Sequence, residues 1–269
     1  MLMHSPFDIM AETYDSDFTH SEIGQLQRKK VWQFLSPVIS SYQRKIKILE
    51  LNCGTGEDAL ELARLGHSVT ATDASEKMIQ KSREKAELLN RSNIRFETCS
   101  FEELHQFFNM ERFDLVISNF GGLNCINKKE LTLLSQQLSV LTEDSGKLFL
   151  VIMSRRCLWE IFYFSVKGKW STAFRRMKRS VMFSIGENQF SVFYYSPENV
   201  KRIFAQFFTY IHSYPVGLLI PPSYLEKTFL KHKHWLFHLS RWENKLNKYN
   251  LFSNLADHFC IILQKKGEQ

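Results

Sequence analysis

The sequence lacks any apolar run near the length that a membrane-spanning helix requires. A spanning helix needs about 18 apolar residues, and the best runs here are residues 148–153 and 161–166. The first ten residues carry neither a basic lead nor a long apolar stretch, so no secretory signal is expected. Internal repeats and low-complexity linkers are absent as well. These absences favour one folded domain outside the membrane.

Cysteine is scarce, and its pattern suggests no pairing. There are five cysteines, an odd number, and no two form a CxxC pair. This argues against a disulfide framework and against a thiolate metal site. No H-x-x-x-H or paired-carboxylate spacing suggests a metal either. We therefore expect a metal-free protein of the reducing cytoplasm.

Acidic residues are few in the second half of the chain. The formal charge of the 269 residues is +7. Residues 1–153 carry 17 Lys or Arg against 21 Asp or Glu, a balance of −4, and residues 154–269 carry 18 against 7, a balance of +11. The length suits one large α/β domain, with or without a cap. The basic character belongs to whatever follows residue 153.

From residue 45 onward, short β-rich runs alternate with helical periodicity. We expect strands at residues 46–51, 68–71, 93–98, 113–118 and 147–153, with helices at 57–65, 75–90, 101–108 and 128–140. Such alternation is typical of a parallel sheet with crossover helices. The fourth and fifth runs are almost unbroken apolar, as central parallel strands should be.

The alternation breaks after residue 153. Residues 155–179 have helical character, 181–185 and 189–195 suggest a hairpin, and a helix is expected from 197 to about 204. Further on we expect a strand at 207–220, a helix from 224 to 248 and a final strand at 258–264. We interpret the chain as a single domain, residues 1–269. Its parts are a helical N-terminal lid (1–40, with helices at about 9–14 and 23–34), a cofactor-binding core (41–153), an inserted α/β cap (154–196) and a C-terminal part that completes the sheet (197–269).

A glycine-containing turn follows the first expected strand. Glycine lets a backbone approach a ligand closely, and Asn52 also tolerates the left-handed conformation that such turns use. Asp73 stands at the end of the second expected strand, after the helix that Gly56 opens. A carboxylate there can accept hydrogen bonds from both ribose hydroxyls of an adenosine. Turn and acid together predict an adenosine-containing cofactor at this edge of the sheet.

Two kinds of cofactor fit this pattern. Residues 54–59 also match G-x-G-x-x-[GA], the fingerprint of dinucleotide sites. A pyrophosphate on the turn would lie near the carboxylates of Glu50, Glu57 and Asp58, with no nearby Lys or Arg to offset them. S-adenosyl-L-methionine has no phosphate, and its ammonium and sulfonium are attracted by a carboxylate. The electrostatics therefore favour S-adenosylmethionine over NAD.

Residues 8–153 resemble the class I, Rossmann-like methyltransferases that use S-adenosylmethionine. The resemblance is carried by residues 48–56 (ILELNCGTG), 72–79 (TDASEKMI) and 113–124 (FDLVISNFGGLN), and by the opening stretch 11–15 (AETYD). It implies a doubly wound, mostly parallel seven-stranded sheet with helices on both faces, and S-adenosylhomocysteine as the product. In that family the acid of the second strand holds the ribose, the Tyr of the opening stretch contacts the methionine part, and the end of the fourth strand lies beside the transferred methyl group.

Carried over residue by residue, the resemblance implies a set of cofactor-binding positions. These are Tyr14, Glu50, Asn52, Cys53, Gly54, Gly56, Asp73, Ala74, Met78, Ser100, Phe101, Asn119 and Phe120. Met78 would lie near the adenine.

One position departs from the family. The third strand usually ends in Gly-Asp, whose carboxylate accepts from the adenine amino group, and here Ser100 takes the place of the acid. A hydroxyl can accept the same hydrogen bond, at a cost of about 1 kcal/mol for the lost charge assistance. A relative that binds the cofactor without turnover therefore stays an alternative.

The catalytic groups are not identified by the sequence. Methyl transfer from a sulfonium requires that the nucleophile and the methyl group be held about 3 Å apart and that water be excluded. A general base is needed for a hydroxyl nucleophile, and less so for a neutral amine. His20 and His212 are better explained as structural residues, so we name no base.

Residues 155–179 carry the clearest signal about the acceptor. They contain eight Lys or Arg against one acid, interleaved with aromatic residues. Three interpretations fit this composition. The segment has a solvated basic face over an aromatic stripe that faces the core, or it contacts an anionic or amphiphilic substrate or a membrane surface, or it contacts nucleic acid. The fourth-strand motif lacks the N/D-P-P-[YFW] run of base N-methylating relatives. It resembles relatives that act on small molecules such as sugars and polyketides, so we favour a small-molecule acceptor over RNA.

Overall fold

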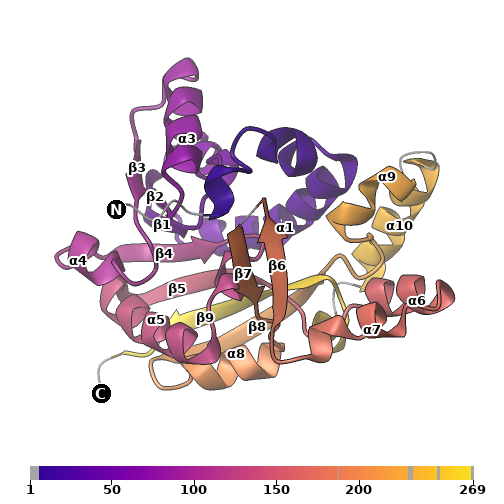
Figure 1. Cartoon of the computed structure of the whole chain (residues 1–269). Coiled ribbons are helices and arrows are strands. Elements are labelled where there is room, and N and C mark those ends of the chain that lie inside the picture. The colour runs from indigo at the N-terminus through magenta and orange to yellow at the C-terminus, as the bar shows by residue number, and fades with distance from the viewer. Residues whose placement is uncertain (1–5, 187, 230–232, 247–248, 268–269) are drawn as a thin grey trace.

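A seven-stranded sheet forms the centre of the molecule (Figure 1). The structure is a computed structural model that describes residues 6–186, 188–229, 233–246 and 249–267. The strand order is β3-β2-β1-β4-β5-β9-β8, with β9 antiparallel to both neighbours and the other pairs parallel. The strands are β1 (Lys47–Leu51), β2 (Ser68–Asp73), β3 (Ile94–Thr98), β4 (Phe113–Ser118), β5 (Thr142–Met153), β8 (Phe208–Val216) and β9 (His258–Lys265). The predicted doubly wound, mostly parallel seven-stranded sheet is confirmed.

Helices cover both faces of the sheet and form two apolar cores. On one face lie α1 (Glu22–Ser40), α2 (Glu57–Arg64) and α3 (Glu76–Leu88), and on the other α4 (Leu104–Phe108), α5 (Lys128–Leu141) and α8 (Pro197–Phe204). Several helices begin at side-chain caps, among them Ser21, Ser75, Asn127 and Ser196. Since both faces are covered, β4 is buried along its whole length, which explains its unbroken apolar sequence.

Two insertions stand beside the sheet. Between β5 and α8 lie α6 (Leu158–Val166), α7 (Trp170–Ala173), a 3-10 turn (Arg175–Met177) and the hairpin of β6 (Val181–Ile185) and β7 (Asn188–Val192). Between β8 and β9 lie α9 (Glu226–Phe229) and α10 (Lys233–Leu246). Figure 1 shows α6, α7, α9 and α10 at the same end of the molecule. No helix among the described residues is long and apolar enough to span a membrane.

Three predicted helices differ in the structure. The helix expected over residues 155–179 breaks into shorter pieces, because Gly168 adopts a left-handed φ of 68° between α6 and α7. Residues 224–248 form α9 and α10, and the end of the predicted helix lies outside the described residues. Residues 9–14 form turns between a 3-10 turn (Pro6–Asp8) and a π-helix (Asp15–Thr19). We call residues 6–20 the lid segment.

Candidate cofactor and acceptor site

The turn after β1 uses left-handed backbone conformations. Asn52, Gly54 and Gly56 have φ values of 47°, 55° and 78°, and Asn52 tolerates this conformation as predicted. A Cβ on Gly56 would lie 2.8 Å from Ser82 Oγ, so glycine allows α3 to approach the turn. Ser82 Oγ donates to the Gly54 carbonyl at 3.0 Å. The turn is therefore closely packed between β1 and α3.

Glu50 presents a buried carboxylate at the end of β1. Its residue is 1% exposed, and its Oε2 atom has no hydrogen-bond partner among the described residues. Burial, together with the charges of Asp58 and Asp73, raises the pKa of Glu50 well above its usual value, although Arg28 opposes the rise. Such an orphaned oxygen fits a cationic ligand group, since burying a polar atom without a partner is costly.

Cations lie beside this acidic turn, contrary to the expectation that none would be near. Arg28 of α1 forms an ion pair with Asp58 of α2, and Trp32 Nε1 donates to the same carboxylate at 2.7 Å. Lys85 Nζ lies 3.7 Å from Glu57 Oε2. Both cations are far from their partners along the chain, so only the tertiary fold brings them together. Arg28 Nε has no hydrogen-bond partner among the described residues.

Asp73 is the last residue of β2 and lies next to the turn after β1. Its two carboxylate oxygens accept the N–H groups of Gly54 and Ser75, each at 2.9 Å. Burial nevertheless raises the pKa of Asp73, with those N–H donors opposing the rise. Each carboxylate oxygen keeps a further lone pair for a ligand hydroxyl. Of the neighbouring predicted residues, Met78 is 2% exposed inside the first turn of α3, and Ala74 is exposed.

Ser100 has an acid beside it that the sequence analysis did not identify. Its N–H and its hydroxyl both donate to Glu103 Oε2, each at 2.8 Å. These two donors lower the pKa of Glu103. The spacing Ser-x-x-Glu is the capping-box pattern and could have predicted the contact. With its proton donated to Glu103, the Ser100 hydroxyl keeps its lone pairs for a donor. Phe101 follows half-buried and packs against the α4–α5 side of the core.

Asn52 joins the ends of β1 and β4. Its Oδ1 accepts from Ser118 Oγ at 2.5 Å and its Nδ2 donates to the Asn119 carbonyl at 2.6 Å. A Cβ on Gly122 would lie 2.2 Å from Asn52 Cγ, so only glycine fits there. Cys53 is buried, and burial raises the pKa of its thiol well above the usual value. Cys53 is therefore a structural residue rather than a nucleophile.

The lid segment covers the turn. The ring of Tyr14 lies 3.4 Å from where a Cβ on Gly54 would stand, and Asp15 Oδ1 accepts from Thr55 Oγ1 at 2.6 Å. Burial raises the pKa of Tyr14 to about 12, so its phenol is neutral at physiological pH. Asp8 Oδ1 accepts from Ser75 Oγ at 2.5 Å. The lid is held by these polar contacts to two different loops.

Phe120 stands at the end of β4 with a left-handed φ of 47°, which is uncommon for a bulky residue. Its ring meets Phe18 of the lid edge to face, with centroids 4.9 Å apart, and the Arg28 guanidinium lies 5.2 Å from its centroid. The preceding Asn119 donates from Nδ2 to Asp58 Oδ2 at 2.7 Å. Strained backbone of this kind is frequent at functional sites.

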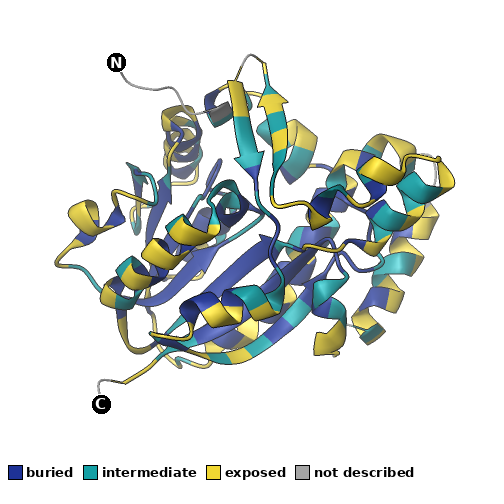
Figure 2. Cartoon of the chain, turned by 60° about the horizontal axis from the view of Figure 1, so that its bottom comes forward, coloured by how far each residue is buried: buried dark blue, intermediate teal, exposed yellow. Residues whose placement is uncertain are grey.

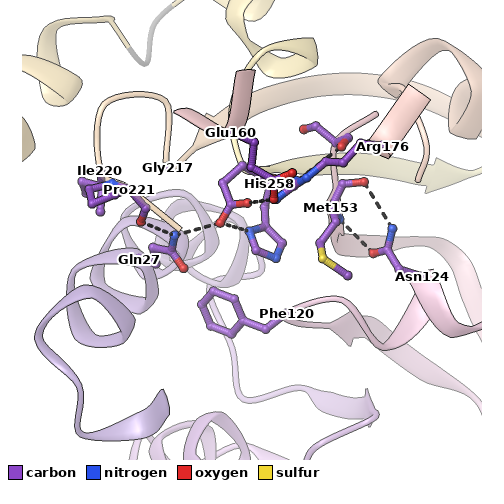
Figure 3. Close-up of polar contacts among 12 residues, drawn as sticks. Gln27, Phe120, Asn124, Met153, Glu160, Arg176, Gly217, Ile220, Pro221 and His258 are labelled. Carbon is purple, nitrogen blue, oxygen red and sulfur yellow. Dashed lines mark hydrogen bonds and ion pairs between the residues drawn. The ribbon is translucent and has the colours of Figure 1, made fainter. Parts of the chain in front are cut away.

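Beyond Phe120 lies a polar network that the sequence analysis did not predict (Figure 3). His258 begins β9 and its ring centroid is 5.9 Å from that of Phe120. His258 Nδ1 lies 3.2 Å from Asp257 Oδ2, and Gln27 Nε2 donates to the same oxygen at 3.1 Å. Arg176 Nη2 donates to Asp257 Oδ1 at 2.6 Å. These residues come from α1, from the start of β9 and from the 3-10 turn after α7.

Two open surface hollows lie elsewhere. One is lined by Arg44, His67 and Asp114 among others, at the amino ends of β1 and β2. The other borders Thr142 and Lys265 at the opposite end of β9 from His258. Ligands of doubly wound sheets bind at the carboxyl ends of the parallel strands, so neither hollow is the cofactor site.

A family comparison agrees with this geometry. Residues 43–185, more than half of the chain, match the model of a methyltransferase domain family. The chain belongs to the class I methyltransferases. Its sequence is also 30% identical to the tRNA 5-carboxymethoxyuridine methyltransferase of Escherichia coli (strain K12) over 100 residues, 36% of this chain and 38% of that protein. The match thus spans well under half of that relative.

Solved structures share the fold of this methyltransferase at low sequence identity. The CcbJ methyltransferase from Streptomyces caelestis superposes with a TM-score of 0.63 at 14% identity, over 98% of this chain and 99% of that one. Magnesium protoporphyrin IX methyltransferase from Synechocystis PCC 6803, solved with bound S-adenosylhomocysteine, gives 0.57 at 14% identity, over 91% and 85% of the two chains. S-adenosylmethionine is the cofactor of this family.

The residues present in this methyltransferase fit that cofactor. The orphaned Glu50 Oε2 suits the cofactor ammonium, and Arg28, with its unpartnered Nε, suits the carboxylate of the same methionine part. Asp73 and Ser100 stand at the ends of the next two strands with acceptor capacity to spare. Phosphate, by contrast, would meet the buried charge of Glu50. The fold brings together most of the predicted residues, and adds Arg28 and Glu103 to them.

Proposed function

We propose that this chain transfers a methyl group from S-adenosylmethionine to an O or N atom of a small molecule. A sugar, a polyketide-like compound or a lipid-like metabolite is the expected class of acceptor. The observation that carries this proposal is the covered methyl end of the site. Phe18 of the lid closes on Phe120 there, and Phe7 meets Phe190 of the β6–β7 hairpin with ring centroids 5.4 Å apart. A covered site excludes water and suits a compact acceptor.

The chain's own residues have distinct parts in this reaction. When bound, the cofactor supplies a methyl group made electrophilic by its sulfonium. Glu50 and Arg28 would hold the two charges of the methionine part, Asp73 the ribose hydroxyls and Ser100 the adenine amino group. Tyr14 and Phe18 would close over them and exclude water. The division of charge between Glu50 and Arg28 would orient the bound cofactor.

An RNA acceptor is a second candidate. It is supported by the partial similarity to a tRNA methyltransferase and by a surface that we call the cap face. The cap face consists of the exposed side chains Phe162, Val166, Lys167, Lys169, Trp170, Phe174, Trp235, Phe237, Arg241, Trp242 and Lys245. Stacking rings beside cations are also used by proteins that bind single-stranded RNA.

Contact with an anionic or amphiphilic partner explains the cap face as well, and we favour it. Exposed Trp and Phe beside Lys and Arg suit a lipid–water interface. We propose that residues 155–179 touch such a surface and admit a lipid-like acceptor from it. All five cysteines are free, which supports a reducing, cytoplasmic location.

Calorimetric titration with S-adenosylhomocysteine, with NAD as a parallel ligand, tests the cofactor assignment. We expect binding of the former alone, and a loss of about 10- to 100-fold in affinity in Asp73→Ala and Glu50→Ala, since charge-assisted hydrogen bonds contribute about 1.5–3 kcal/mol. Glu61→Gln on the outer side of α2 is the matched control. Unchanged binding in both site variants would contradict the assignment.

Tritiated S-adenosylmethionine then distinguishes the acceptor classes. The panel contains reducing sugars, hydroxylated aromatic compounds, hydroxy fatty acids and bulk tRNA. Label in a small molecule supports the proposal, and label in tRNA supports the second candidate. Tight cofactor binding with no label in any class would favour a non-catalytic relative.

A further inference from the structure

A buried ionic network lies directly behind the methyl end of the site. Arg176 is 4% exposed, and its guanidinium bridges Glu160 at 2.7 Å and Asp257 at 2.6 Å. It also donates to the Asp257 carbonyl at 2.8 Å. Arg175 forms a second pair with Glu160 at 2.7 Å. The network holds Asp257 through both its carboxylate and its backbone carbonyl.

Asp257 is held in its charged form. Burial opposes ionisation, but the interactions of Asp257 with His258 and Arg176 lower the pKa of Asp257 well below its usual value. Gln27 Nε2 donates to Asp257 Oδ2 at 3.1 Å and thereby fixes the carboxylate from α1. Three different elements therefore orient one carboxylate.

The carboxylate faces one nitrogen of His258. Nδ1 lies 3.2 Å from Asp257 Oδ2, whereas Nε2 has no hydrogen-bond partner among the residues that the structure describes. The Nδ1 contact is an ion-pair approach that is not yet aligned as a hydrogen bond, as is common for catalytic pairs before a substrate is bound. Figure 3 shows the imidazole beside the ring of Phe120, between Gln27 and Met153.

The position of the carboxylate decides which nitrogen can accept a proton. A carboxylate at Nδ1 favours the tautomer with the proton on that nitrogen, which leaves a lone pair on Nε2 of His258. This is the arrangement of a carboxylate-oriented general base.

We propose that His258, oriented by Asp257, is the general base that accepts the proton of a hydroxyl or ammonium acceptor. The inference rests on the proposed function, because it places the acceptor of that reaction beside His258, next to Phe120 and Met153. The acceptor it implies carries an ionisable O–H or N–H group. A carboxylate acceptor, already without its proton, would not need it.

The step balances without another reactant. The acceptor oxygen or nitrogen supplies the electron pair of the new bond to carbon, and the electron pair of the broken C–S bond stays on sulfur as the product thioether. The acceptor proton moves to His258 Nε2. Asp257 then stabilises the imidazolium, and water takes the proton after the product leaves.

Charged groups stand near the Asp257–His258 pair. Arg176 pairs with Asp257 and with Glu160, and the Arg28 guanidinium lies over the ring of Phe120. Gln27 and Met153 are neutral. Since only a neutral base accepts a proton, kcat should rise with pH.

NMR of protein labelled with ¹⁵N in histidine tests the proposal without an acceptor. Spectra of the wild type and His258→Gln identify the imidazole, and His212→Gln on β8 is the matched control, because His212 pairs with Ile262 further along β9. At pH 8 we expect the proton on Nδ1 and none on Nε2, with the ratio shifted toward Nε2–H in Asp257→Asn. A proton on Nε2 in the wild type would overturn the proposal.

Turnover gives the second measurement. With the acceptor that takes label in the panel, His258→Gln should lower kcat about 100-fold, the low end for general-base catalysis. It should also abolish the rise of kcat with pH, while affinity for S-adenosylhomocysteine stays within twofold. Wild-type turnover in His258→Gln would refute the base but leave the methyltransferase assignment intact. Failure of the wild type to bind S-adenosylhomocysteine would instead refute the proposed function, and the imidazole spectrum would still decide the state of His258.

Discussion

Glu50 is a buried carboxyl group whose charge destabilises the free protein and, in the proposed function, pairs with the cofactor ammonium. Its pKa in the folded state is raised by burial above the usual value, so the unfolded chain loses this proton at lower pH than the folded chain. The folded state therefore binds more protons in the window between the two pKa values, and stability falls as pH rises through it. The ligand-free protein is destabilised by Glu50 above that window.

Glu50→Gln should consequently stabilise the ligand-free protein at pH 8 relative to the wild type, and by less at pH 5. The same change should weaken binding of S-adenosylhomocysteine, because the neutral amide does not pair with the ammonium. Thermal unfolding at both pH values and calorimetry measure the two effects. Glu61→Gln is the control, since that carboxylate is partly exposed beside Arg64. A variant less stable than the wild type at pH 8 would contradict the argument.

Ser100 and Glu103 should act together on the adenine side. Ser100→Ala removes one neutral hydrogen bond of about 0.5–1.5 kcal/mol and should weaken cofactor binding roughly 2- to 12-fold. Glu103→Gln removes the charge that polarises the hydroxyl and should weaken binding less. Ser139→Ala, an α5 residue whose hydroxyl bonds only its own helix, is the control. Equal affinity in Ser100→Ala and wild type would remove Ser100 from the site.

The sequence predicted those site residues that lie close to one another along the chain. The turn, Glu50 and Asp73 belong to one strand–turn–helix–strand unit, so spacing alone indicates them. Arg28 reaches Asp58 only through the packing of α1, and His258 reaches Phe120 from the far end of the chain. No local pattern reports such contacts. For this reason the sequence did not predict the cations near the turn.

At the scale of elements, the contact between the ends of β1 and β4 depends on Gly122, which has no side chain. Gly122→Ala would place a Cβ 2.2 Å from Asn52 Cγ, so we expect a loss of about 1–3 kcal/mol in the free energy of unfolding and weaker cofactor binding. Asn52→Gly in the same chain removes the clash and should restore part of both. Denaturant unfolding and calorimetry measure them.

Gly168→Ala distinguishes the effect of backbone strain on stability from an effect on cofactor binding. Its Cβ would meet nothing within 4 Å, but its φ is 68°, so it should cost roughly 1–2 kcal/mol of stability and leave cofactor affinity unchanged. If Gly168→Ala lost as much cofactor affinity as Gly122→Ala, the contact between the ends of β1 and β4 would have no specific effect on cofactor binding.

Helices and strands were predicted well where their periodic apolar residues are buried. The parallel strands and α2, α3 and α5 follow apolar patterns that the two cores confirm. Residues 155–179 have the expected helical character, but in short pieces, because the left-handed Gly168 separates α6 from α7. The helix predicted at 9–14 was wrong because side chains on distant loops hold the lid segment, among them Ser75 and Thr55. The lid's own sequence has too little periodicity to form a regular helix.

At the scale of the whole molecule, the acids that the structure describes in the two insertions are buried or hydrogen-bonded. Glu160 and Glu243 are buried, and Glu226 accepts the N–H groups of Glu22 and Ile23 at the start of α1, at 2.9 and 3.0 Å. The exposed charges here are therefore basic among the described residues. Lys167 and Lys169 lie between α6 and α7, Lys227 lies on α9, and Arg241 and Lys245 lie on α10. Figure 2 colours exposed positions yellow. An anionic surface would meet no repulsion there.

We expect the protein to sediment with phosphatidylserine vesicles at low salt and to be released at high salt. Lys167→Glu with Lys169→Glu should weaken this binding about 10-fold or more, since each cation near an anionic bilayer contributes about 1 kcal/mol. Lys128→Glu with Lys129→Glu, two residues at the start of α5, is the control. Binding of tRNA but not vesicles would favour the RNA acceptor. Binding of neither would mean that the cap face is only a solvated surface.

The lid segment has a consequence for the timing of the reaction. Its bonds to Ser75 and Thr55 and the ring of Tyr14 over Gly54 lie across the entrance of the cofactor turn. Every exchange of spent for fresh cofactor therefore requires these contacts to break. We therefore expect product release, rather than the transfer itself, to limit the cycle. Product and cofactor would then compete for the same covered site, and turnover should depend on the ratio of their concentrations.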